Sequence, residues 1–184
     1  MAVEDALKGG IKAIQLREKD LPTRELLEMA QWMRGLTKEY GANLIINDRV
    51  DVALAVGADG VHLGRDSIPA NAVRIISDGK LLIGVSTHGI GEAIEAEKYG
   101  ADFITLGPIY ETPSKFKYGS PIGIDMIRQV KSNLSIPVLA IGGIKLNKVH
   151  EVTEAGADGI ALISAILTAK NIKETTEELM RFLK

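Results

Sequence analysis

The chain has 184 residues, a formal net charge of −2 and no cysteine. This length suffices for one domain, and the lack of cysteine excludes a disulfide framework, a thiolate zinc site and a cysteine nucleophile. The charge balance gives no general basicity, so we expect neither nucleic acid nor a membrane as partner. The acidic start lacks the pattern of a signal peptide, and no run reaches the ~18 apolar residues of a membrane helix. We therefore expect a cytoplasmic protein.

A helical pattern, a glycine-centred turn and a short apolar run recur along the chain. The turn reads Gly-Ala-Asp at residues 57–59, 100–102 and 156–158, with related turns at 9–11 and 41–43. Glycine takes the left-handed conformation that ends a helix and leads into a strand. The apolar runs are too short for helices and rich in branched residues, as buried parallel strands are. They are Ile11–Leu16, Asn43–Ile46, Gly60–Leu63, Leu81–Val85, Phe103–Leu106, Pro137–Ile141 and Gly159–Ile163.

Helical patterns fill the segments between these runs. This alternation indicates either a doubly wound sheet or a (β/α)8 barrel. The strands are closely spaced and no Gly-x-Gly-x-x-Gly opens the first helix, so we favour the α/β class with a (β/α)8 TIM barrel. The clearest helical patterns are Arg24–Glu39, Gly91–Tyr99, Ile124–Lys131, Asn147–Ala155 and Lys173–Leu183.

The length and the start of the chain modify this expectation. TIM barrels usually have about 250 residues, and residues Val3–Lys8 already have the pattern of a helix's last turns. We therefore expect a single TIM-barrel domain over residues 1–184, truncated at its N-terminus so that the first strand is missing.

The residues just past the carboxyl end of each strand form the active-site face of such a barrel. Gln15 lies at the end of the first run and Arg17 and Lys19 follow it, and alternation places the three side chains on one side. Asn47 and Asp48 follow the second run. Polar residues or glycines follow the later runs as well: Asp66, Ser86, His88, Thr112, Ser114, Lys115, Gly142, Gly143 and Ser164.

Two sets of these residues suit an anionic ligand, and the first of them is rich in glycine. Gly142, Gly143 and Ser164 follow the last two runs, where barrels bind phosphate through backbone N–H groups. Two adjacent glycines are also compatible with a plain tight turn. Two separate anion sites would imply either one doubly phosphorylated substrate or two phosphorylated substrates.

The second of these two sets combines cations with carboxylates. Arg17, Lys19 and Lys115 would face Asp48 and Asp66 across the mouth of the barrel. A diphosphate with a bridging Mg²⁺ requires such a set, because Mg²⁺ prefers oxygen ligands and takes few of them from the protein. Capping of the following helix is the alternative role for either aspartate.

Only one histidine suits acid–base chemistry. His88 ends a strand and faces the mouth, which makes it the candidate imidazole acid or base. A structural hydrogen bond in the loop is the alternative for this side chain. We expect His62 to pack inside a strand and His150 to lie on a helix surface.

Five motifs together resemble the thiamin phosphate synthase family. They are the sequences at residues 15–19, 47–51, 58–64, 107–115 and 140–144. The resemblance covers essentially the whole chain and extends to the thiazole tautomerase sister family, which shares the barrel. It implies a transferase of thiamin biosynthesis that couples hydroxymethylpyrimidine diphosphate with thiazole phosphate, giving thiamin phosphate and diphosphate with the help of Mg²⁺.

The resemblance also implies roles for individual residues. The pyrimidine diphosphate would be held by Gln15, Arg17, Lys19, Asn47 and Lys115, with Ser86 on the pyrimidine side. The metal would be held by Asp48 and by the acidic residue Asp66. The thiazole phosphate would be received by Thr112, Ser114, Gly143, Ile163 and Ser164.

One motif departs from the family pattern. The family usually has Gly-Gln-Glu-Asp after the run Gly60–Leu63, whereas this chain has Gly64-Arg65-Asp66-Ser67. Ser67 thus occupies the usual ligand position, with Asp66 one residue earlier. Two alternatives therefore stand beside the synthase: a thiazole tautomerase in which His88 moves a proton without metal, and a non-catalytic thiamin-phosphate-binding paralogue. An exposed barrel edge would favour a homodimer.

Overall fold

Seven parallel strands form one curled sheet in the computed structural model, which describes residues 1–112 and 120–183. Neighbouring strands follow chain order from β1 to β7. Each of the seven predicted runs forms a strand, with slightly shifted ends. The strands are β1 (Ala13–Leu16), β2 (Asn43–Asn47), β3 (Gly60–Leu63), β4 (Leu82–Thr87), β5 (Phe103–Leu106), β6 (Val138–Ile141) and β7 (Gly159–Ala161).

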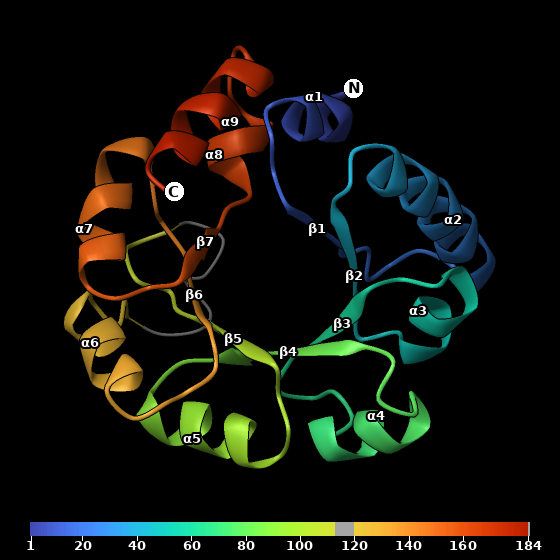
Figure 1. Ribbon diagram of the computed structural model, residues 1–184, viewed down its shortest axis with the longest axis horizontal. Coiled ribbons are helices and arrows are strands. Elements are labelled where there is room, and N and C mark those ends of the chain that lie inside the picture. Colours follow the sequence, from blue (N-terminus) through green and yellow to red (C-terminus); the bar gives the residue numbers. More distant parts are fainter. Residues whose placement is uncertain (113–119, 184) are drawn as a thin grey trace.

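Helices connect the strands and lie outside the ring that the strands form (Figure 1). The five clearest helical patterns are all confirmed as helices. The helices are α1 (Ala2–Lys8), α2 (Thr23–Glu39), α3 (Val50–Val56), α4 (Ala70–Ile76), α5 (Ile90–Lys98), α6 (Asp125–Lys131), the 3₁₀ turn η2 (Leu146–Lys148), α7 (Val149–Glu154), α8 (Ser164–Leu167) and α9 (Ile172–Arg181).

The sheet is a TIM-like half-barrel that stays open between β1 and β7 (Figure 1). Within residues 1–112 and 120–183 these two strands do not pair with each other and no eighth strand lies between them. Helix α1 packs against α9 beside this opening. The close approach requires Gly9, because a Cβ at that position would lie 2.6 Å from the Cβ of Thr176.

The core divides into two hydrophobic clusters on either side of β4. One cluster gathers side chains of β2, β3 and β4 with those of α2, α3 and α4, among them Leu44, Ile46 and Ile83. The other gathers side chains of β5 and β6 with those of α5, α6, α7 and α9, among them Ile104 and Val138. The strands at the opening are less buried than these central strands.

The aspartates of the repeated turn anchor the strands at their amino ends. Each accepts a backbone N–H from the preceding strand and pairs with a cation of the helix that leads into that strand, namely α2, α4 or α6. The aspartate therefore adds long-range contacts to the turn. Asp59 accepts from Leu44 at 2.7 Å and pairs with Arg34. Asp102 accepts from Ile83 at 2.7 Å and pairs with Arg74 at 2.6 Å. Asp158 accepts from Val138 at 2.7 Å and pairs with Lys131 at 2.8 Å.

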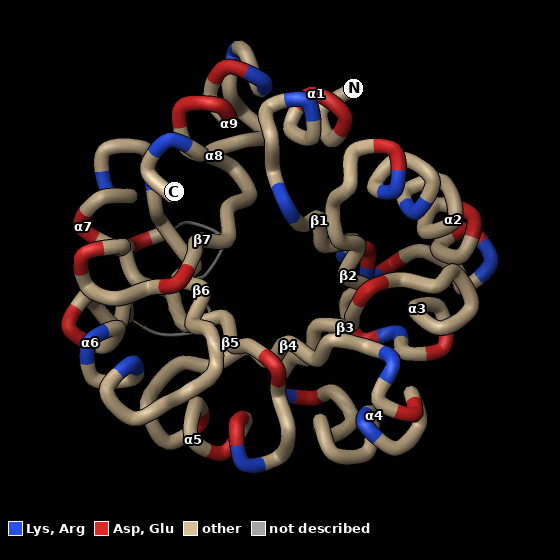
Figure 2. Tube along the Cα trace, viewed as in Figure 1, with Lys and Arg blue, Asp and Glu red and all other residues tan. Residues whose placement is uncertain are grey.

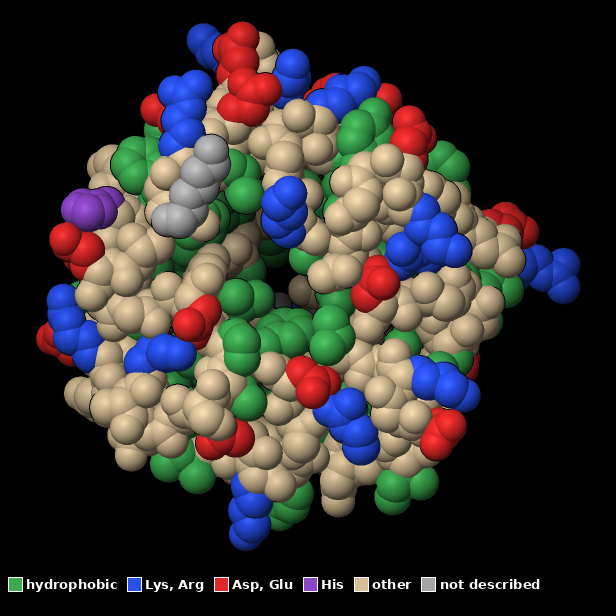
Figure 3. Space-filling view, viewed as in Figure 1, with side chains coloured by type: hydrophobic (Ala, Val, Ile, Leu, Met, Phe, Trp, Pro, Cys, Tyr) green, Lys and Arg blue, Asp and Glu red, His purple; other side chains and the backbone are tan. Residues whose placement is uncertain are grey.

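Charged residues lie mostly on the outer helices and their connections (Figure 2). The space-filling view shows a hollow at the centre of the ring with hydrophobic side chains at its rim (Figure 3). In the described part of the chain, no helix is both long and apolar enough to span a bilayer.

Candidate functional site

Side chains at the carboxyl ends of β1, β2 and β3 form a continuous series of hydrogen bonds. Gln15 Nε2 donates to Asn47 Oδ1 at 3.1 Å, and Asn47 Nδ2 donates to Asp48 Oδ2 at 3.1 Å. The Ser67 hydroxyl donates to the other carboxylate oxygen, Asp48 Oδ1. Because parallel strands present their carboxyl ends at one edge of a sheet, the predicted residues Gln15, Asn47 and Asp48 meet there.

Asp48 has an unusual backbone conformation. Its φ is +62°, in the left-handed region that aspartate tolerates better than most residues. The amide N–H of Asp48 donates to His62 O at 3.0 Å, so a backbone hydrogen bond to β3 stabilises this conformation. Asp78 also has a positive φ, in the turn after α4, so the conformation of Asp48 motivates a functional hypothesis only together with its place at the carboxyl end of β2.

Two cations follow β1 at the same edge of the sheet. Arg17 and Lys19 are exposed, and Leu16 before them is 5% exposed. The predicted alternation does not continue beyond Leu16, because β1 ends there and Glu18 between the two cations is exposed as well. Within the described residues neither cation forms an ion pair. Both charges therefore remain available to an anion. Lys115, the third predicted cation, lies outside the described residues.

Arg49, next to Asp48, is instead engaged in the protein's own structure. Its guanidinium contacts Asp51 at 2.9 and 2.6 Å and donates to Thr23 Oγ1 at 3.1 Å. The hydrogen bonds from Arg49 hold the pKa of the Asp51 carboxyl below its ordinary value. This pair ties the start of α3 to the start of α2 and leaves Asp48 as the carboxylate that faces the site.

The glycines after β6 lie against the loop after β5. The amide of Tyr110 donates to Gly142 O at 3.0 Å, and the amide of Ile109 donates to Ile141 O at 2.9 Å. Gly143 has a φ of +66°, and a Cβ there would lie 2.5 Å from Glu111 O. The positive φ and the close contact both require glycine at this position. The loop that leads to Thr112 thus runs beside the predicted phosphate-binding glycines, whereas Ser114 lies outside the described residues.

Ser86 and His88 mark the carboxyl end of β4. Ser86 belongs to the strand and is partly buried, and His88 follows it. His88 Nδ1 lies 3.0 Å from Glu92 Oε2, and its backbone N–H donates to the same oxygen at 2.7 Å. One carboxylate of α5 thus fixes both the loop and the imidazole ring.

Ile163 and Ser164 follow β7 at the last predicted position. Ile163 is 62% exposed, and Ser164 begins the short helix α8. They lie beside the opening of the ring. The two other histidines behave as expected: His62 is buried with its Nε2 3.1 Å from Thr105 Oγ1, and His150 is exposed on α7.

The oxygen groups around Asp48 fit a hard divalent cation. No group of three or more His, Cys, Asp or Glu side chains suited to a metal occurs in the described residues. Mg²⁺ does not need such a cluster, because it keeps several waters and takes one or two carboxylates together with substrate phosphates. Asp48 accepts hydrogen bonds from the neutral donors Ser67 and Asn47, so its charge is left for a cation.

Two contacts of the site were not predicted from the sequence. Ser67 lies against Asp48, whereas the predicted second ligand Asp66 is exposed and makes no hydrogen bond or ion pair with Asp48 among the described residues. Glu92, in the first turn of α5, binds His88, which lies two residues before that helix. The acidic residue in the first helical turn was a usable signal, since such a side chain can reach back to the chain that enters the helix.

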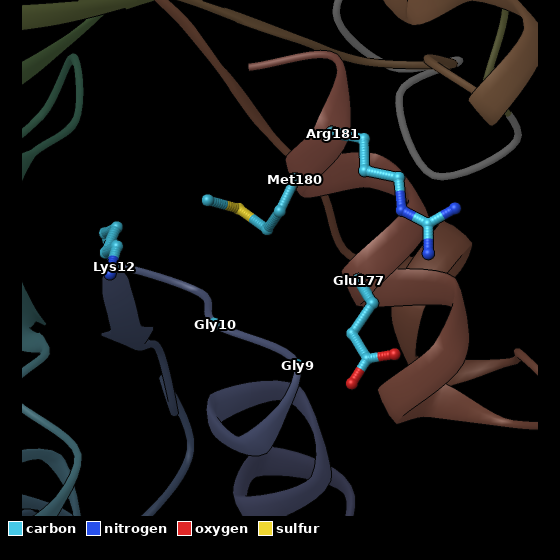
Figure 4. A pocket seen from close by; sticks show the side chains of 6 residues that line it. All are labelled: Gly9, Gly10, Lys12, Glu177, Met180 and Arg181. Carbon is cyan, nitrogen blue, oxygen red and sulfur yellow. The ribbon is translucent and has the colours of Figure 1, made fainter. Parts of the chain in front are cut away.

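A cavity of about 360 Å³ lies elsewhere, at the amino end of β1 (Figure 4). It is lined by Gly9, Gly10 and Lys12 before β1 and by Glu177, Met180 and Arg181 of α9. The active-site face of a parallel barrel is at the opposite, carboxyl ends of the strands. We therefore do not assign this cavity to the candidate site.

The fold and the site define a class: a TIM-like α/β protein with cationic, amide and carboxylate side chains at the carboxyl ends of its parallel strands. The chain belongs to the thiamine monophosphate synthase family, whose profile matches residues 1–166. The predicted family resemblance is thereby confirmed.

Individual relatives agree with this assignment. A thiamine-phosphate synthase of Halalkalibacterium halodurans is 50% identical over 175 residues, which are 95% of this chain and 83% of that protein. A thiamine-phosphate synthase of Shouchella clausii is 46% identical over 178 residues, covering 97% of this chain and 85% of that protein. The solved thiamine phosphate pyrophosphorylase of Pyrococcus furiosus superposes with a TM-score of 0.92 at 43% identity, covering 99% of this chain and 87% of that one.

Proposed function

We propose that this protein is a thiamin phosphate synthase that couples hydroxymethylpyrimidine diphosphate with thiazole phosphate. The observation that carries the proposal is the hydrogen-bonded series Gln15–Asn47–Asp48–Ser67. Beside it lie Arg17 and Lys19, two exposed cations that form no ion pair within residues 1–112 and 120–183. Amides, cations and one uncompensated carboxylate are the groups that a metal-associated diphosphate requires. Membership of the synthase family supports the same assignment.

The proposed reaction exchanges one bond for another. The bond between the pyrimidine methylene carbon and the diphosphate oxygen breaks, and its electron pair leaves with the diphosphate. The ring nitrogen of the thiazole then supplies the pair for the new carbon–nitrogen bond. This chemistry depends on charge neutralisation and alignment, which is consistent with a site whose described residues offer exposed cations and no activated nucleophile.

On the diphosphate side, Arg17, Lys19 and Lys115 would neutralise the leaving group, and Gln15 and Asn47 would orient it. Asp48 would hold Mg²⁺, which when bound supplies further positive charge to the departing diphosphate. Ser86 would contact the pyrimidine.

On the thiazole side, the phosphate would lie at the glycines after β6. Gly143 can present its backbone N–H without a side chain in the way, and the loop to Thr112 runs alongside. Ser114, Ile163 and Ser164 would complete this subsite. The nitrogen of the thiazole would thereby point toward the pyrimidine side.

We also propose that the curled sheet is a (β/α)8 barrel lacking one strand between β1 and β7. Among the described residues, the outer edges of β1 and β7 have no strand partner, which together with the ring of outer helices supports this interpretation. Exposed strand edges of this kind favour pairing with another chain, so a homodimer is the expected assembly.

Product formation tests the proposed function. The purified protein is incubated with both substrates, with and without Mg²⁺, and thiamin phosphate is quantified by chromatography. We expect product with Mg²⁺ only. Substrate binding by the folded protein without any product would leave the non-catalytic paralogue as the better description.

The tautomerase alternative is tested with His88→Asn. The contact between His88 and Glu92 resembles an oriented acid–base pair, which in this respect favours the tautomerase. The synthase needs no proton transfer at this position, so the variant should retain synthase activity. Tautomer conversion by the wild-type protein that is lost in His88→Asn, with no coupling activity in either, would support the tautomerase.

A further inference from the structure

Ser67 bridges a loop amide and the Asp48 carboxylate. Its Oγ accepts a hydrogen bond from Gly64 N at 2.6 Å and donates its proton to Asp48 Oδ1. The turn that follows β3 is closed by the bond from Ser67 N to Gly64 O at 3.2 Å. The loop after β3 therefore fixes the orientation of the carboxylate at the end of β2.

The carboxylate keeps capacity for a cation in this arrangement. An ionised carboxylate has about four acceptor positions, and hydrogen bonds from Ser67 and Asn47 account for two of them. Both donors are neutral, and no ion pair of Asp48 occurs in the described part of the chain. The negative charge of Asp48 is thus oriented but not neutralised.

Asp66 has none of these contacts. It is exposed, while the neighbouring Ser67 is partly buried against Asp48. A shift of the carboxylate of Asp66 into the site would displace the hydroxyl that now bonds both Gly64 and Asp48. The loop as folded therefore presents a hydroxyl, and no second carboxylate, to the cation position.

We propose that Ser67, and not Asp66, is the positioning residue of the cation site, and that the cation binds firmly only together with a diphosphate. The second part follows from the first, because one protein carboxylate gives Mg²⁺ too few anionic ligands without substrate phosphate oxygens. This inference rests on the proposed function for the identity of the diphosphate, but its test does not depend on turnover.

Equilibrium dialysis of Mn²⁺, used as a probe for Mg²⁺, tests the proposal on the whole protein. Bound Mn²⁺ is measured by atomic absorption, with and without inorganic diphosphate on both sides of the membrane. For the wild type we expect diphosphate to raise the Mn²⁺ affinity by about tenfold or more. Equal affinity with and without diphosphate would overturn the proposed dependence.

Three variants separate Ser67 from Asp66. Ser67→Ala should weaken Mn²⁺ binding in the presence of diphosphate by about tenfold, as loss of an outer-shell partner does. Ser67→Thr retains a hydroxyl and should restore most of the affinity. Asp66→Asn is the matched control and should bind Mn²⁺ as the wild type does. A loss in Asp66→Asn equal to that in Ser67→Ala would overturn the assignment.

A fourth variant, Ser67→Asp, adds the missing carboxylate. It should bind Mn²⁺ without diphosphate more tightly than the wild type, and unchanged or weaker binding would contradict the single-carboxylate site. Circular dichroism confirms that each variant is folded. Mn²⁺ binding that depends on Ser67, without any formation of thiamin phosphate, would contradict the proposed function but not this inference. Formation of thiamin phosphate, with Mn²⁺ binding that does not depend on Ser67, would contradict this inference but not the proposed function.

Discussion

Asp48 connects the backbone, the hydrogen-bond network and the chemistry of the candidate site. Its φ of +62° places the carboxylate beyond the end of β2, where Asn47 and Ser67 orient it. The sequence predicted Gln15, Asn47 and Asp48 correctly as neighbours at this edge, because strand ends alone bring them together. It did not predict the contact of Ser67, since that depends on how the loop after β3 folds back.

The first prediction concerns the cations after β1. Arg17→Ala should lower the catalytic efficiency of thiamin phosphate formation by about a hundredfold, because it removes charge from the leaving diphosphate. Arg17 makes no ion pair in the described chain, so the free energy of unfolding should change by less than about 0.5 kcal/mol. Steady-state kinetics and urea denaturation measure the two effects.

Lys12→Ala is the matched control for this variant. Lys12 is also exposed and precedes β1, but it lies at the amino end of the strand beside the cavity of Figure 4. Its activity should equal that of the wild type. Equal losses in both variants would mean that general charge, rather than position at the carboxyl edge, accounts for the effect.

The second prediction concerns Gly143. An alanine Cβ would lie 2.5 Å from Glu111 O in a backbone with φ of +66°, a strain of about 1–3 kcal/mol. Gly143→Ala should raise the KM for thiazole phosphate more than the KM for the pyrimidine diphosphate. Gly91→Ala is the control, since a Cβ there meets nothing within 4 Å. Equal rises in both KM values would contradict a separate thiazole phosphate subsite at Gly143.

At the scale of elements, the repeated turns position the strands on which the site depends. Each aspartate bonds the amino end of one strand and a cation of the helix that leads into that strand. The short apolar runs predicted all seven strands from sequence, and the recurring glycine turn precedes five of them. Strand ends were less predictable: β1 begins at Ala13 rather than Ile11, and β4 extends to Thr87, because pairing with the neighbouring strand decides where a strand ends.

The third prediction tests this anchoring. Asp102→Ala removes the acceptor for Ile83 N–H and the partner of Arg74. It should lower the free energy of unfolding by about 1–3 kcal/mol, because the strand N–H of Ile83 loses its acceptor and the Arg74 guanidinium, which still donates to Gly100 O and Leu81 O, loses its carboxylate. Glu154→Ala, which breaks an exposed pair with His150, should cost less than about 0.5 kcal/mol. Similar losses in urea denaturation would contradict the special role of the turn aspartates.

The fourth prediction concerns a contact between α5 and the segment before β6. Glu97 Oε1 accepts hydrogen bonds from Ser135 Oγ at 2.6 Å, Ser135 N at 2.8 Å and Ile136 N at 3.2 Å. The Ser135 hydroxyl first, and then the backbone donors, lower the pKa of Glu97 from its ordinary value of 4.5. A lowered pKa means that the stabilisation is present above the ordinary value and is lost as the pH falls through the folded-state pKa.

Glu97→Gln should therefore be less stable than the wild type at pH ~7, and the difference should shrink as the pH falls below about 4. The urea midpoints of both proteins across this range measure the effect. A difference that stays constant with pH would show that the charge of Glu97 does not contribute.

At the scale of the whole molecule, the site depends on the curvature of the sheet. Residues far apart in sequence, from Gln15 to Ser164, lie at or just past the carboxyl ends of parallel strands, and these strands curl into one ring (Figure 1). Helix–strand alternation predicted the α/β class and the parallel order. It could not define how the ring is completed, because the sheet is open between β1 and β7 and closure depends on what pairs with those edges.

The most direct test of the account is a ³¹P NMR measurement of the coupling reaction with both substrates and Mg²⁺. We predict that the wild type releases one diphosphate for each thiamin phosphate formed, and that Asp48→Asn slows this conversion by about a hundredfold or more while remaining folded. Absence of thiamin phosphate with the folded wild-type protein, or an unchanged rate in Asp48→Asn, would contradict the account.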